Sequence, residues 1–295
     1  MGHHHHHEHD HAEGNIRVAF FLNIGFTLIE LVGGIFTNSL AILSDALHDL
    51  GDSLSLGLSW YFQRVSKKGR TKNYSYGFRR FSLLAAIINS IVLVTGSIII
   101  ITHAIPKLLS PTETNSKGML LLAILGIVIN GAAVLRLQKG KSLNEKVVSL
   151  HLLEDVLGWV AILIGSIFMM YFDAPFLDPL LSIGITMFVL VNVYKNLKKS
   201  IPILLQGIPN DVSIKNIQNQ IKEIPEIADV HDSHAWTMDG EYHIFTIHIV
   251  LKNDHRLSEL TVIKEKVKSI VKTGGIDHAT IEFENENEDC MLEDC

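Results

Sequence analysis

The sequence predicts an all-α membrane domain of six transmembrane helices, followed by a small C-terminal α/β domain. Three observations support this fold class. Hydrophobic residues make up 47% of the 295 residues and charged residues only 19%, a balance typical of polytopic membrane proteins. Six apolar stretches reach about 20 residues or more, the length that crosses roughly 30 Å of hydrocarbon. Beyond Leu205 the long apolar runs end, and the remaining third is polar and acid-rich.

The connections between the apolar stretches predict the orientation of the chain. Basic residues crowd the second and fourth connections and the segment after the sixth stretch, whereas the opposite connections offer only Lys107 and Lys117. The positive-inside rule then places both termini in the cytoplasm of a multi-pass protein in the cell membrane. The predicted spans are 16–36, 40–63, 79–106, 118–138, 147–171 and 177–197.

The C-terminal third has the pattern of a small domain with the element order αββαβ. The second predicted strand alternates regularly, and the turn Met238-Asp239-Gly240-Glu241 joins it to the first as a hairpin. A domain of this size buries only a small core, so dimerisation would help it. The predicted elements are a helix at 212–223, strands at 229–237 and 242–251, a helix at 257–272 and a strand at 278–284. The predicted regions are a His-rich tail 1–15, a transmembrane domain 16–205, a C-terminal domain 206–284 and an acidic tail 285–295.

Two His-x-x-x-Asp motifs lie inside apolar stretches and indicate a metal site. His48 and Asp52 share one helical face in the second span, and His151 and Asp155 do so in the fifth. Ionisable residues at membrane depth are costly and are functional by default. Two imidazoles and two carboxylates together offer the four ligands of tetrahedral Zn²⁺. The same donors suit Co²⁺, Cd²⁺ or Mn²⁺, and imidazole can exchange a metal ion for a proton.

Other acids beside these motifs have several readings. Asp45 is a candidate partner that orients a ligand histidine, and Asp49 can equally face another helix. Glu154 points about 100° away from its neighbour Asp155 on a helix, which favours a packing or gating role. The sequence alone leaves these roles open.

With these motifs the sequence resembles the cation diffusion facilitator family, and within it the bacterial zinc/cobalt/cadmium exporters. Further matching motifs are Asn38-Ser39-Leu40-Ala41-Ile42-Leu43-Ser44-Asp45-Ala46, Tyr76-Gly77-Phe78-Arg79-Arg80 and His231-Asp232-Ser233-His234-Ala235-Trp236. The resemblance implies an inner-membrane homodimer with a cytoplasmic ferredoxin-like domain and proton-coupled efflux. It also implies a zinc transport site at His48, Asp52, His151 and Asp155. The family commonly has Glu where this chain has Ser82.

Histidines outside the membrane stretches suggest further metal binding. The resemblance implies zinc sites in the C-terminal domain with a regulatory role; His231 and His248 match best, with His234 and Glu284 as further candidates. The same residues can also be surface or strand-edge side chains. The N-terminal run His3 to His7 is either an expression tag or a native metal-gathering tail. Cys290 and Cys295 give only a weak metal-binding signal.

These observations predict a proton-coupled exporter that moves Zn²⁺, with Co²⁺ or Cd²⁺ as alternatives, across a lipid bilayer. A passive divalent-cation channel and an intramembrane metallohydrolase are the competing readings. A channel favours weak multi-site binding rather than a closed four-ligand site, and the chain lacks a His-Glu-x-x-His motif. It also lacks a phosphate-binding Gly-x-x-x-x-Gly-Lys-Ser/Thr loop, which argues against ATP-driven pumping. We expect no nucleic-acid partner and no enzymatic activity.

Overall fold

The computed structural model describes residues 6–66, 68–138, 143–286 and 288. The chain forms two compact units. We call residues 1–61 and 85–196 the helical unit, and residues 62–84 and 197–295 the C-terminal unit.

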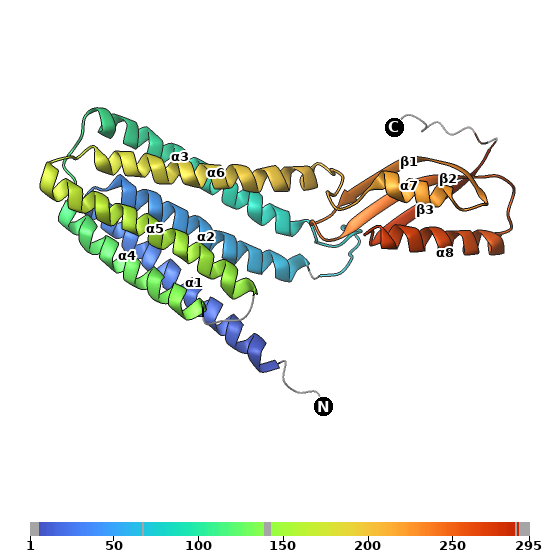
Figure 1. Ribbon diagram of the computed structural model, residues 1–295, viewed down its shortest axis with the longest axis horizontal. Helices are drawn as coiled ribbons and strands as arrows, with labels where there is room; N and C mark the ends of the chain where they lie inside the picture. Colours follow the sequence, from blue (N-terminus) through green and yellow to red (C-terminus); the bar gives the residue numbers. More distant parts are fainter. Residues whose placement is uncertain (1–5, 67, 139–142, 287, 289–295) are drawn as a thin grey trace. The chain divides into compact units, whose positions relative to one another are not determined.

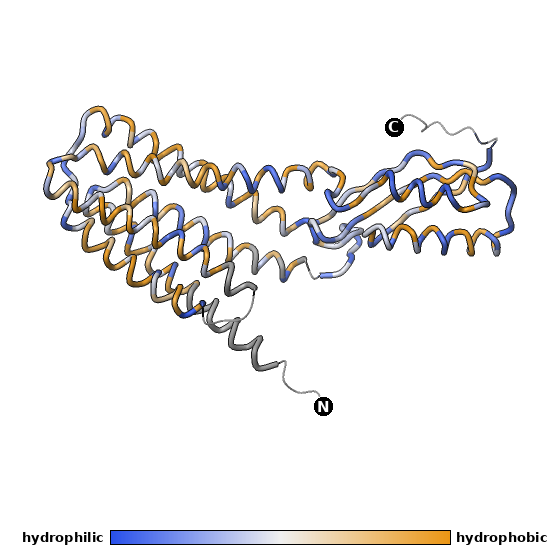
Figure 2. Tube along the Cα trace, in the orientation of Figure 1, coloured by the Kyte–Doolittle hydropathy of each residue, from blue (hydrophilic) through white to orange (hydrophobic). Residues whose placement is uncertain are grey.

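In the described residues, six long helices form the first two thirds of the chain (Figure 1). Five of them, α1 and α3 to α6, are long and apolar enough to cross a membrane. Figure 2 shows the apolar colour along these helices. Their bounds are α1 His6–Thr37, α2 Leu40–Ser66, α3 Phe81–Leu109, α4 Ser116–Leu137, α5 Leu143–Phe172 and α6 Leu177–Leu204.

Helices α1 and α2 differ from the expectation in one respect each. Helix α1 begins at His6, ten residues before the predicted span, because no proline interrupts the polar segment ahead of the apolar run. Helix α2 has 27 residues but falls outside the apolar group, because three aspartates and a histidine interrupt its hydrophobic surface.

Helix α4 packs against α5 and α1 to form the tight core of the helical unit. Trp159 of α5 is fully buried and lies against Phe26 of α1, with ring centroids 5.5 Å apart. Gly126 of α4 makes room for the indole: a Cβ atom built there would lie 2.4 Å from the Trp159 ring. The small residue therefore sets how closely α4 and α5 approach.

Helix α2 is fastened to α6 at its first turn by a buried carboxylate. Asp178 accepts hydrogen bonds from the Ser39 hydroxyl at 2.5 Å, from the Leu40 backbone N–H at 2.9 Å and from the Ala41 backbone N–H at 3.2 Å. The two N–H groups are backbone donors that a helix N-terminus leaves without partners, and a negative charge there is favoured by the helix dipole. One turn further, the Ser44 and Ser182 hydroxyls lie 2.6 Å apart. The interaction fixes the segment of α2 that precedes the histidine motif.

The C-terminal unit contains a three-stranded sheet with two helices, in the predicted order αββαβ. Strand β1 pairs antiparallel with β2, and β2 pairs parallel with β3, so that β2 is central. Phe245, Ile247 and Ile249 of β2 are fully buried against both helices. The elements are α7 Ile214–Lys222, β1 Ile227–Thr237, β2 His243–Leu251, α8 Leu257–Thr273 and β3 His278–Asn285.

Candidate metal centre

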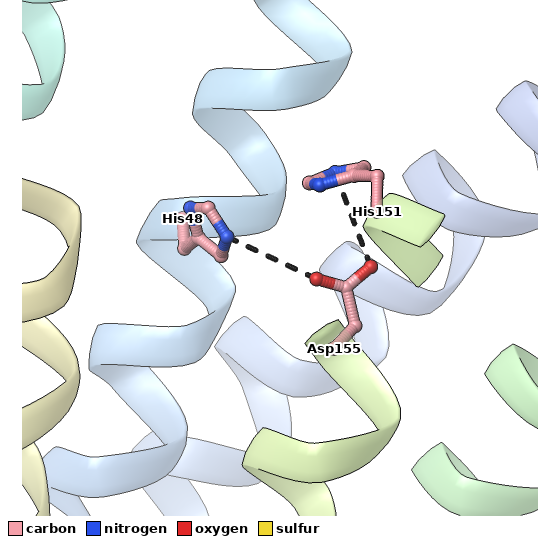
Figure 3. Close-up of side chains that lie close together, drawn as sticks. All are labelled: His48, His151 and Asp155. Atoms are coloured by element: carbon pink, nitrogen blue, oxygen red, sulfur yellow. Dashed lines mark ion pairs between the residues drawn. The ribbon is translucent and has the colours of Figure 1, made fainter. Parts of the chain in front are cut away.

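The two His-x-x-x-Asp motifs meet between α2 and α5. His48 and Asp52 project from one face of α2, and His151 and Asp155 from one face of α5. Figure 3 shows His48, His151 and Asp155, with the Asp155 carboxylate between the two imidazoles. The four-residue spacing explains this geometry, since side chains at i and i+4 of a helix lie one above the other.

The donor atoms of His48, His151 and Asp155 lie within 4.8 Å of one another, close enough to hold a metal ion, and Asp52 approaches both histidines. Asp52 Oδ2 lies 2.9 Å from His151 Nε2 and 3.6 Å from His48 Nε2. Asp155 Oδ1 lies 3.8 Å from His48 Nε2, and its Oδ2 lies 4.0 Å from His151 Nε2. Neighbouring donors around tetrahedral zinc are about 3.3 Å apart, given metal–ligand bonds of about 2.0–2.2 Å. For all four to bind one ion, the Asp52 side chain has to join the group that His48, His151 and Asp155 already form.

The four side chains form two layers, because α2 and α5 run in opposite directions. His48 and Asp155 make the deeper layer, with side chains 11% and 1% exposed. Asp52 and His151 make the second layer and are 24% and 33% exposed. Among the described residues, neither ring nitrogen of His48 and neither oxygen of Asp155 has a hydrogen-bond partner. Buried polar atoms are nearly always paired, so these four atoms are available to a ligand.

Three more carboxylates lie buried near this site. Glu30 of α1 and Asp49 of α2 are fully buried, and none of their four oxygens has a hydrogen-bond partner within the described chain. Asp45 is also buried, and its Oδ2 has no such partner either. Asp45 does not hydrogen-bond His48, so the orienting contact that the sequence suggested is not formed. Glu30 was not predicted, although a charged residue inside an apolar stretch is itself a signal.

A cavity of about 440 Å³ adjoins the deeper layer of the site. It lies between α2, α5 and α6, and both His48 and Asp155 contribute to its wall. Apart from four ionisable side chains the wall is apolar. The complete lining is Asp45, His48, Glu154, Asp155, Leu157, Gly158, Ala161, Leu180, Leu181, Gly184, Ile185 and Phe188.

A second group of candidate ligands lies on the sheet of the C-terminal unit. His231 of β1 is directly opposite His248 of β2, and their ring centroids are 5.4 Å apart. Glu284 of β3 contacts both: its Oε1 lies 2.6 Å from His248 Nδ1, and its Oε2 lies 3.1 Å from His231 Nε2. The three strands therefore bring His231, His248 and Glu284 together as a group that could hold a metal ion.

His234 lies apart from that group and reaches it through Asp232. A bulge between His231 and His234 shifts the register, and Asp232 within it has a positive φ of 42°. The Asp232 carboxylate lies 2.7 Å from His234 Nε2 and 3.4 Å from His248 Nε2. The bulge explains why simple alternation along the strand did not place His234. Residues 1–5 and the cysteines Cys290 and Cys295 lie outside the described residues.

Comparison with known proteins identifies the class to which this fold and site belong. Residues 16–205 match the model of the cation efflux transmembrane domain, and residues 209–286 match that of the cation efflux protein cytoplasmic domain. The chain therefore belongs to the cation efflux family, known as the cation diffusion facilitators. It is a multi-pass membrane transporter of metal cations, which rules out the intramembrane hydrolase.

Characterised relatives cover nearly the whole chain. A cadmium, cobalt and zinc/H(+)-K(+) antiporter of Bacillus velezensis is 32% identical over 96% of this chain and 92% of its own length. The metal cation efflux system protein CzcD of Cupriavidus metallidurans is 34% identical over 92% of this chain and 86% of its own length. The zinc transporter ZitB of Escherichia coli is 32% identical over 94% of this chain and 88% of its own length.

Proposed function

We propose that this protein exports Zn²⁺ from the cytoplasm in exchange for protons, with His48, Asp52, His151 and Asp155 as the transport site. The observation that carries the proposal is the cluster of donor atoms from His48, His151 and Asp155 within 4.8 Å of one another, with Asp52 Oδ2 2.9 Å from His151 Nε2 and 3.6 Å from His48 Nε2. Relatives named for zinc, cadmium and cobalt support the choice of metal. Mixed nitrogen and oxygen donors suit these ions.

The same residues provide the exchange of metal for protons. Histidine binds a metal only when it is neutral, so arriving protons compete with Zn²⁺ for the imidazoles of His48 and His151. Because each helix supplies one imidazole and one carboxylate, separating α2 from α5 would divide the ligand set in half and release the ion. The proposal thus combines proton competition with a change in helix spacing. The name of the Bacillus relative includes K⁺, so the flux assay described below is run with and without a potassium gradient.

The proposal includes six membrane crossings, with both termini in the cytoplasm. Helix α2 is the additional crossing beside the five apolar helices α1 and α3 to α6. Helix α2 is less apolar than the other five because it carries the polar residues of the transport site. In this proposal those residues face other helices rather than lipid. The uneven distribution of Lys and Arg supports the orientation.

We further propose that the C-terminal domain is a ferredoxin-like dimerisation domain that binds regulatory zinc. His231, His248 and Glu284 supply three donors. The family model that residues 209–286 match describes a cytoplasmic domain, which fits the position of this domain after α6. Zinc bound there would stabilise one arrangement of the domain and could bias transport. The expected readout is additional zinc in the full-length dimer that His248→Ala removes, while the zinc bound at the transport site remains.

The decisive experiment measures zinc flux into proteoliposomes under an imposed pH gradient. The protein should drive zinc uphill when protons flow the other way, and His151→Ala should abolish this flux. His103→Ala is the matched control: His103 lies in α3, is exposed, and its Nδ1 is 2.8 Å from the Ile99 carbonyl oxygen of its own helix. Flux that ignores the gradient would indicate a channel, and normal export by His151→Ala would refute the transport site.

A further inference from the structure

The cavity beside the transport site runs in one direction along the helices. On α5 its lining extends from Glu154 and Asp155 to Ala161, which lies about 9 Å beyond Asp155 at 1.5 Å per residue. On α6 it extends from Phe188, whose ring centroid is 6.1 Å from that of His48, to Leu180, about 12 Å away. Both directions lead toward the end of the bundle where α2 begins and α5 ends.

Asp45 lies on this route, one helical turn beyond His48. The two residues are three positions apart in α2, which places Asp45 about 4.5 Å further along the helix axis. Gly158 of α5 lies at the same level, since a Cβ atom there would be 3.5 Å from Asp45 Oδ1. Asp45 is 3% exposed, and within the residues that the structure describes its Oδ2 has no hydrogen-bond partner. The cavity therefore has one buried carboxylate available beyond the transport site.

We propose that Asp45 receives the metal ion as it leaves the four-ligand site, and that the cavity between α5 and α6 is the release path. This inference rests on the proposed function. It adds a fifth metal-binding residue that acts after His48 and Asp155. It also predicts that the ion leaves toward the end of the bundle that holds the connections after α1, α3 and α5.

The chemistry of the cavity explains why such a residue is needed. Beyond Asp155, the walls on α5 and α6 consist of Leu, Gly, Ala, Ile and Phe, which offer no side-chain ligand to a divalent ion. An ion leaving His48 and Asp155 without a replacement would be exposed to a strongly unfavourable apolar environment. A carboxylate one turn away can bind the ion before His48 and Asp155 release it. The four-ligand site and then Asp45 form consecutive steps.

Replacement of Asp45 separates release from binding. Asp45→Asn should bind zinc in detergent with the stoichiometry of the wild type and with an affinity within about twofold, while flux into proteoliposomes falls at least tenfold. Flux at the wild-type rate would overturn the proposal. Loss of zinc binding would also overturn it, because Asp45 would then belong to the holding site. Absence of flux in the wild type would instead refute the proposed function.

A matched pair of glycines tests the cavity. Gly184 of α6 and Gly131 of α4 both have open space where a Cβ would point, but only Gly184 lines the cavity. Gly184→Leu should fill the path and lower flux at least tenfold with zinc binding retained, whereas Gly131→Leu should transport like the wild type. Equal flux in the two variants would refute the release path.

Thiol labelling tests the path without filling it, and it applies even if Gly184→Leu fails to fold. In a background with Cys290 and Cys295 replaced by serine, Ala161→Cys should react with a charged, water-soluble thiol reagent and be protected by zinc. Ile164→Cys is the control, because Ile164 is exposed on the outer surface of α5 and does not line the cavity. Equal reactivity of the two cysteines would contradict a hydrated path.

Discussion

Replacing Asp178 by Asn tests whether α2 depends on α6 for its position. The carboxylate is fully buried and accepts three hydrogen bonds, two on Oδ1 and one on Oδ2, from the first turn of α2 and the residue before it. Asparagine keeps a single acceptor oxygen, so at least one buried donor loses its partner and faces an N–H group instead.

The magnitude follows from these contacts. A buried donor without a partner costs about 1–3 kcal/mol, and hydrogen bonds to a charged group contribute about 1.5–3 kcal/mol each. We therefore expect Asp178→Asn to destabilise the protein by about 2–4 kcal/mol. For a unit of this size, that corresponds to a fall in Tm of roughly 5–15 °C.

The assay is thermal unfolding of the purified protein in detergent, followed by aggregation or fluorescence. Asp173→Asn is the matched control, because Asp173 lies exposed in the connection between α5 and α6 and the substitution removes the same charge. Its positive φ of 42° is one that Asn tolerates. If the two variants unfold within 1–2 °C of each other, the buried carboxylate does not hold α2 and the reasoning from its three contacts is wrong.

Three further outcomes are expected. Gly126→Ala should lower Tm, because its Cβ would lie 2.4 Å from a buried indole, while Gly131→Ala, with open space, should not; equal Tm values would contradict the close packing of α4 on α5. Glu284→Gln should weaken zinc binding by the C-terminal domain at least tenfold in a metal titration of the full chain, since the residue contacts both histidines; unchanged affinity would remove it from the ligand set. The pKa of Asp229 is lowered from 3.8 chiefly by its hydrogen bond from Lys222, so this pair stabilises the fold at neutral pH and stops doing so as pH falls through that lowered pKa. Because the pair is exposed, Asp229→Asn should cost under about 1 kcal/mol at pH 7, and the difference from wild type in chemical denaturation should vanish in strong acid rather than grow.

The sequence predicted the elements of the fold well because each has a strong local pattern. Apolar runs of membrane length gave helices α1 and α3 to α6, and alternation with a Met238-Asp239-Gly240-Glu241 turn gave the hairpin of β1 and β2. Boundaries were less accurate where polar residues are compatible with a helix, as at His6, where α1 begins before the apolar run. The bulge at Asp232 was missed because a register shift depends on how two strands pair, which the pattern of one strand does not show.

The candidate ligands were predictable because their spacing is a local pattern in the sequence. The roles of nearby buried acids such as Asp178 and Glu30 were not predictable. The spacing of His48 with Asp52 and of His151 with Asp155 is visible in the chain, and one face of a helix is enough to pair them. The role of Asp178 at the start of α2 depends on a contact across 137 to 139 residues of sequence. The burial of Glu30 likewise depends on how α1 packs, so only the three-dimensional structure shows it.

The contrast between Asp178 and Asp155 indicates why the site between α2 and α5 is built for a ligand. Both carboxylates are buried in the same helical unit, yet Asp178 has three hydrogen-bond donors, whereas Asp155 has none among the described residues. With the two nitrogens of His48, four buried atoms have no hydrogen-bond partner among the described residues, although both Asp155 oxygens lie within 4.0 Å of a histidine nitrogen. A purely structural polar network would satisfy these atoms, as the chain does around Asp178. Hydrogen bonds left unmade at these atoms leave them able to bind a divalent ion or protons, which supply the missing interactions. The residues with unsatisfied atoms, rather than the best-bonded ones, are therefore where substitution should change transport more than stability.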